Sequence, residues 1–70
     1  MSRMTGTLLT PGDEINVVVT STKPFGLFVE SDGGLSGLVR GGSAAVGATL
    51  RVRVIEFDAL ASRFSAMLLG

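Results

Sequence analysis

Five short segments rich in β-branched and aromatic residues, separated by glycine-rich turns, limit the fold of this chain more than any other feature. In the first segment Ile15, Val17 and Val19 recur at every second position, as in a half-buried strand. Asp32-Gly33-Gly34 is typical of a hairpin turn, because glycine adopts positive φ without a steric penalty. Strands are predicted at residues 14–22, 25–31, 35–40, 50–57 and 63–69.

No helix longer than one turn is predicted, since the alanines of residues 41–47 are too few to sustain one. Five short strands with tight turns favour an all-β fold that closes into a small barrel, which leaves no exposed sheet edge. Seventy residues suffice for one domain. We expect a single domain at residues 10–70, preceded by a flexible N-terminal tail at residues 1–9, where no hydrophobic period is evident.

The element Phe25-Gly26-Leu27-Phe28-Val29 places two aromatic residues three positions apart in the second predicted strand. Residues three apart point to opposite faces of a regular strand, but a glycine often marks a bulge. We predict a bulge at Gly26 that brings Phe25 and Phe28 to the same side of the sheet. Two rings beside an arginine form a surface on which bases can stack, which predicts single-stranded nucleic-acid binding.

Composition excludes several classes of function. The chain has no histidine and no cysteine, so the commonest general base and the commonest metal ligands are missing. We therefore expect no enzymatic activity, no metal site and no cofactor. No apolar run approaches the ~20 residues that span a bilayer, and the N-terminus lacks the apolar core of a signal peptide. A cytoplasmic protein without membrane contact is the expectation.

The charges weaken the nucleic-acid hypothesis. Six basic and six acidic residues give a formal net charge of zero, whereas nucleic-acid-binding domains are usually basic. Binding would then depend on where the charges lie. If RNA binds, the acidic residues should lie mostly away from the binding surface, namely Asp13, Glu14, Glu30, Asp32 and Glu56.

The order of these elements resembles the RNA-binding repeat of ribosomal protein S1. The similarity runs from Pro11 to about Phe64 and includes Gly12-Asp13, Phe25-Gly26-Leu27-Phe28-Val29, Gly37-Leu38-Val39, Val46-Gly47 and Arg63-Phe64-Ser65. It implies a five-stranded closed barrel of the oligonucleotide/oligosaccharide-binding (OB) fold, with short loops. It also implies a stand-alone domain that binds single-stranded RNA with little sequence specificity, in translation or another RNA process.

The resemblance also implies a set of binding residues. The two aromatics would stack bases. An arginine takes the place of the usual histidine after Gly-Leu-Val at the end of strand three, and an aspartate and an arginine flank the last turn. Two further arginines on strand four would contact phosphates. The implied RNA-binding residues are Phe25, Phe28, Arg40, Arg51, Arg53, Asp58 and Arg63. Strand one differs from the pattern, because Ser21 and Thr22 stand where basic residues are common.

Several alternatives stay open at the level of sequence. Phe25 and Phe28 could fill the core, the arginines could be a solvated face, and Asp58 with Arg63 could be a structural ion pair. The apolar end at residues 66–69 is either core or an exposed strip that forms a homodimer or partner interface. If the strip is exposed, the barrel would be a protein-interaction module that has lost RNA binding. The same stacking surface would also permit single-stranded DNA.

Overall fold

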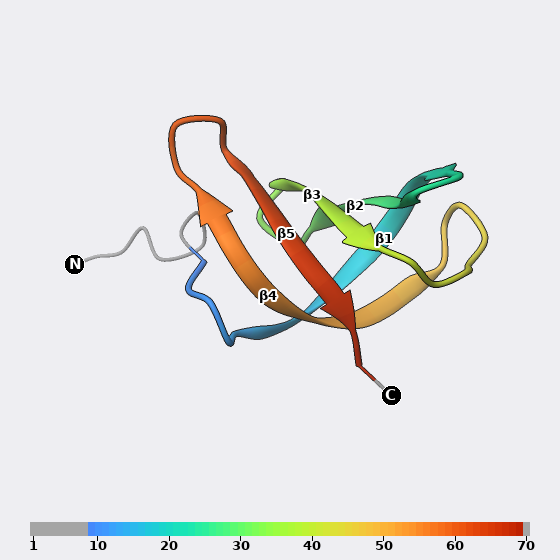
Figure 1. The fold of residues 1–70 in the computed structure, drawn as a ribbon, viewed down its shortest axis with the longest axis horizontal. Helices are drawn as coiled ribbons and strands as arrows, with labels where there is room; N and C mark the ends of the chain where they lie inside the picture. Colours follow the sequence, from blue (N-terminus) through green and yellow to red (C-terminus); the bar gives the residue numbers. More distant parts are fainter. Residues whose placement is uncertain (1–8, 70) are drawn as a thin grey trace.

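The five predicted strands form a closed barrel in the computed structural model, which describes residues 9–69 (Figure 1). Their order around the barrel is β1-β2-β3-β5-β4. All neighbours are antiparallel except β3 and β5, which run parallel and close the barrel. The bounds are β1 Glu14–Lys23, β2 Gly26–Ser31, β3 Ser36–Arg40, β4 Thr49–Asp58 and β5 Arg63–Leu68.

The predicted fold class is confirmed, and each strand end differs from its prediction by at most one residue. Phe25 is one of these differences, because it belongs to the turn between β1 and β2 instead of to β2. The predicted N-terminal tail lies outside the described residues except for Leu9, which packs against the core. No helix is present between residues 9 and 69.

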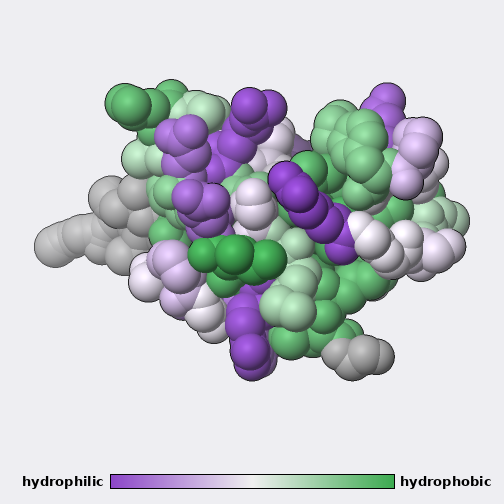
Figure 2. Space-filling view, in the orientation of Figure 1, coloured by the Kyte–Doolittle hydropathy of each residue, from purple (hydrophilic) through white to green (hydrophobic). Residues whose placement is uncertain are grey.

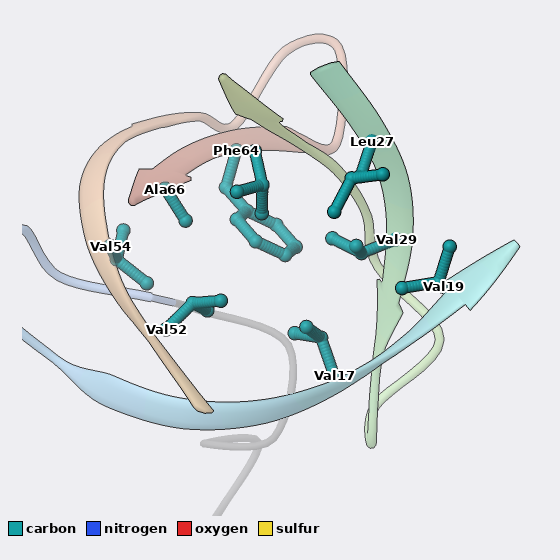
Figure 3. Close-up of a cluster of buried hydrophobic side chains, with 9 residues drawn as sticks. Val17, Val19, Leu27, Val29, Val52, Val54, Phe64 and Ala66 are labelled. Carbon is teal, nitrogen blue, oxygen red and sulfur yellow. The ribbon is translucent and has the colours of Figure 1, made fainter. Parts of the chain in front are cut away.

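Small aliphatic side chains and one aromatic ring fill the barrel. Figure 3 shows Phe64 reaching into its centre, surrounded by valines from β1, β2 and β4. Gly37 faces this ring, and a Cβ at that position would overlap it. Burial of each such side chain contributes roughly 1.5–3 kcal/mol. The buried hydrophobic residues are Val17, Val19, Leu27, Val29, Val39, Val52, Val54, Phe64 and Ala66.

Two β-bulges interrupt the barrel, and neither is at Gly26. In β1, Val19 pairs with Val29 and Ser21 with Phe28, so Thr20 is the extra residue. The Thr20 hydroxyl donates a hydrogen bond of 3.2 Å to the carbonyl oxygen of Phe28. In β4 the register shifts between Val54 and Glu56, at Ile55. The predicted bulge at Gly26 is wrong, because Gly26 pairs regularly with Lys23 and with Arg40.

Gly26 is required for a different reason, the close approach of β2 to β3. Its φ is +156°, and a Cβ there would overlap the carbonyl oxygen of Val39. Because backbone atoms cannot move aside, we expect Gly26→Ala to lower the free energy of unfolding by about 2–3 kcal/mol in urea titrations. Gly47→Ala is the control: Gly47 also has positive φ but open space around it, so the expected loss is about 1 kcal/mol. Equal losses in the two variants would contradict the steric explanation.

Candidate nucleic-acid interface

A groove of about 660 Å³ crosses the outside of the barrel. The strand registers bring its lining together. Phe28 on β2 lies beside Leu38 on β3, Leu38 beside Ser65 on β5, and Ser65 beside Glu56 on β4. These four residues form one row across the groove, with the aromatic ring at one end and the carboxylate at the other.

A second row lies next to the first. Ser36 on β3 pairs with Arg63 on β5, and Arg63 pairs with Asp58 on β4. All three residues line the groove. Of the predicted site residues, the structure therefore places Phe28, Asp58 and Arg63 in the same groove.

The two predicted aromatics are on the surface and touch each other. Their ring centroids are 6.0 Å apart and the planes meet at 63°, in an edge-to-face arrangement. Phe25 is 58% exposed and Phe28 is 37% exposed, so the alternative in which both rings fill the core is wrong. The Nζ atom of Lys23 lies 5.6 Å from the centroid of the Phe28 ring, within the range of a cation–π contact. This lysine, which follows Ser21 and Thr22, supplies a positive charge at the end of β1.

Arg40 and Arg63 have no side-chain partner between residues 9 and 69. Neither takes part in an ion pair or a side-chain hydrogen bond there. Arg40 is exposed at the end of β3, opposite Gly26, and so lies beside the Phe25 turn, although it does not line the groove. Both guanidinium groups remain available to an external anion.

Arg51 and Arg53 lie elsewhere and have partners. Arg51 Nη1 donates a hydrogen bond of 3.3 Å to Asn16 Oδ1. Arg53 Nη2 forms an ion pair of 2.9 Å with Glu14 Oε2. Both arginines point outward from β4, but neither lines the groove. The structure does not bring these two residues together with Phe28.

Asp58 has a structural role at the edge of the groove. Its Oδ1 atom accepts hydrogen bonds from the backbone N–H groups of Leu60 at 3.1 Å and Ala61 at 3.2 Å. These bonds hold the tight β4–β5 turn, in which Ser62 has a positive φ of 54°. The ion pair with Arg63 that the sequence left open is not formed in the part of the chain that the structure describes.

The prediction that the acidic residues lie away from the binding surface is wrong for Glu56. Its side chain is exposed and lines the groove together with Asp58. The charged lining is thus two carboxylates and one guanidinium. Figure 2 shows this face with hydrophilic and hydrophobic surface interleaved over β3, β4 and β5, without a broad patch of either kind.

The apolar end of the chain is mostly core. Ala66 is buried and Leu68 packs against the core, whereas Met67 between them is 48% exposed. Both edges of β5 are paired, one with β3 and one with β4. A continuous exposed strip on this strand is therefore absent. No helix in residues 9–69 is long and apolar enough to cross a membrane.

Solved structures with the same fold are found at low sequence identity. The uncharacterized protein MJ1198 from Methanocaldococcus jannaschii superposes with a TM-score of 0.79 at 21% identity, covering 89% of this chain and 95% of that one. GSP13 from Bacillus subtilis gives a TM-score of 0.79 at 23% identity, with 87% and 56% covered.

Mycoplasma genitalium RNase R, in complex with ribose methylated single-stranded RNA, gives a TM-score of 0.68 at 16% identity, with 83% and 13% covered. This chain thus spans about half of GSP13 and a small part of RNase R. No protein-family model and no curated protein sequence matches the chain. These structural neighbours share the fold of this chain and confirm the predicted five-stranded closed barrel of the OB fold.

Proposed function

We propose that this domain binds single-stranded RNA, with little sequence specificity, in the groove across β2, β3 and β5. The observation that carries the proposal is the exposed pair of rings, Phe25 and Phe28, at one end of a groove. The groove also holds Arg63, which has no side-chain partner within residues 9–69. Rings exposed to water lose the benefit of burial, and stacking of bases would restore it. The RNA-bound structure of RNase R, whose matched part has the same fold, supports this direction.

Binding would combine stacking with a few phosphate contacts. Each stacked base contributes roughly 1–3 kcal/mol, and every base offers a flat face, so sequence matters little. Lys23, Arg40 and Arg63 supply positive charge on either side of the aromatic pair. After the entropic cost of association, we expect dissociation constants from millimolar to high micromolar. We propose a cytoplasmic RNA process, such as translation or RNA turnover, as the setting.

Fluorescence anisotropy with labelled oligo-U and oligo-A at low salt tests the proposal. Saturable binding of both oligomers is the expected result. Absence of binding at millimolar protein would overturn it. Oligo-dU in the same assay distinguishes RNA from DNA, because it differs from oligo-U only in lacking the 2′-hydroxyl.

The salt dependence of RNA binding should identify the arginines that contact phosphate groups. Each phosphate contact changes the slope of log K against log salt by roughly −0.7 for single strands. Arg63→Gln should therefore make the slope less steep by about 0.7. Arg53→Gln removes the same charge from a residue that is paired with Glu14 outside the groove, and it should leave the slope unchanged. A larger change for Arg53 than for Arg63 would place the RNA on the β1–β4 side of the barrel, outside the groove.

A protein-binding barrel is the second candidate function. The two carboxylates in the groove favour it, because they repel phosphate, and so does the net charge of zero. A homodimer or a partner would then use the exposed apolar residues of β4 and β5, namely Ile55 and Met67. Sedimentation of the purified chain tests self-association, since a monomer at high concentration would rule out the homodimer.

A further inference from the structure

The position of Glu56 depends on the bulge that precedes it. Val52 and Val54 face the core at alternate positions of β4, so an uninterrupted strand would point Glu56 inward as well. The extra residue Ile55 reverses the alternation. Phe57 then packs against the core, and Glu56 points into the groove. Bulges often re-aim a side chain in this way beside a functional site.

The second bulge of the barrel borders the same groove. Thr20, the extra residue of β1, lines the wall next to Phe28, and Glu56 lines the opposite wall on β4. Both irregularities of the barrel are thus located at the groove. The Glu56 carboxylate, which the bulge in β4 points into the groove, is therefore part of the groove lining.

The two carboxylate oxygens of Glu56 accept no hydrogen bond from any group in residues 9–69. Its carboxylate has no hydrogen bond and no ion pair among them. Asp58, by contrast, already accepts two backbone hydrogen bonds. An ionised carboxylate only accepts hydrogen bonds, and its two oxygens can accept side by side. A ligand that presents two adjacent donors would suit this wall.

Among the four RNA bases, guanine alone has two adjacent donors on its Watson–Crick edge, N1–H and the N2 amino group. Cytosine and adenine have one amino group beside an acceptor nitrogen, and uracil has one N–H between two carbonyl oxygens that a carboxylate repels. Single-stranded RNA is read on these edges once its bases are unstacked. We propose that Glu56 makes the groove prefer guanine at one position, a proposal that rests on the RNA binding proposed above.

The test measures binding of three hexamers that differ at one central position: guanosine, inosine or uridine among uridines. Inosine retains N1–H and lacks the amino group. The full chain should bind the guanosine hexamer about five- to tenfold more tightly than the other two, the lower end of a bidentate contact. Glu56→Gln should reduce this ratio to near one, because the amide replaces one acceptor by a donor. Glu30→Gln, the same charge change at an exposed residue outside the groove, should keep the ratio.

The outcomes separate the two proposals. The unsubstituted chain could bind the three hexamers equally, with this binding lost in Phe28→Ala. That result overturns the guanine preference alone. A ratio that survives Glu56→Gln, or that falls equally in Glu30→Gln, also overturns it. Lack of binding to all three hexamers overturns it together with the proposed function.

Discussion

Replacement of Phe64 with alanine is expected to lower the free energy of unfolding by about 3–5 kcal/mol. Phe64 is 3% exposed and its ring fills the centre of the barrel against Gly37. The valines around it come from separate strands that are held by their ladders, so they cannot collapse into the cavity. A domain of this size has a total stability of roughly 4–10 kcal/mol, so the variant should be largely unfolded well below the melting temperature of the parent protein.

Urea and thermal unfolding followed by far-UV circular dichroism measure the loss. Leu60→Ala is the matched control, because Leu60 is fully exposed in the turn between β4 and β5. Its expected effect is within about 0.5 kcal/mol. A Phe64 variant that unfolds at the same urea concentration as the Leu60 variant would contradict the description of the core.

The second large effect concerns the aromatic pair. Each of Phe25→Ala and Phe28→Ala should weaken RNA binding about tenfold or more, from a stacking contribution of roughly 1–3 kcal/mol per ring. The double variant should bind no RNA measurably at low salt. Because Phe25 is 58% and Phe28 is 37% exposed, little apolar area is lost from the core, and the double variant should fold.

Ile55→Ala controls for removal of an exposed apolar side chain. Ile55 is 52% exposed and lies on β4 without lining the groove, so its loss should leave the affinity within twofold (about 0.4 kcal/mol) of the parent chain. Unfolding curves of all variants show whether each is folded under the conditions of the binding assay. A folded double variant with undiminished affinity would show that the rings do not stack bases.

Strands β1, β2 and β4 could be predicted because their inward positions up to the bulges carry isoleucine, valine or leucine at every second residue. Val17 and Val19 on β1, and Val52 and Val54 on β4, are buried as that period requires. The bulges could not be predicted this way. Thr20 and Ile55 are bulged because of how β1 and β4 pair with β2 and β5, and pairing register depends on residues far away in the sequence.

The candidate site was predicted only where one local element specifies it. Phe25 and Phe28 belong to one hairpin, and their exposure and mutual contact agree with the prediction, although the bulge expected at Gly26 lies at Thr20. Arg53 was assigned to the same surface because the family resemblance implies basic residues there, but its ion pair with Glu14 comes from the pairing of β1 with β4. Glu56 was expected away from this surface because carboxylates repel phosphate, and the bulge at Ile55 that places it in the groove depends on the pairing of β4 with β5.

RNA that lies across β2, β3 and β5, next to the two exposed rings, should perturb the backbone amides of that surface. A titration of the ¹⁵N-labelled chain with a short single-stranded RNA, followed by NMR, measures this effect. We expect saturable shifts at the amides around Phe28, Leu38 and Ser65, with little change at Asn16 and Arg51 on the β1–β4 side. No shifts at millimolar RNA and low salt, or shifts confined to the β1–β4 side, would contradict this position of the RNA.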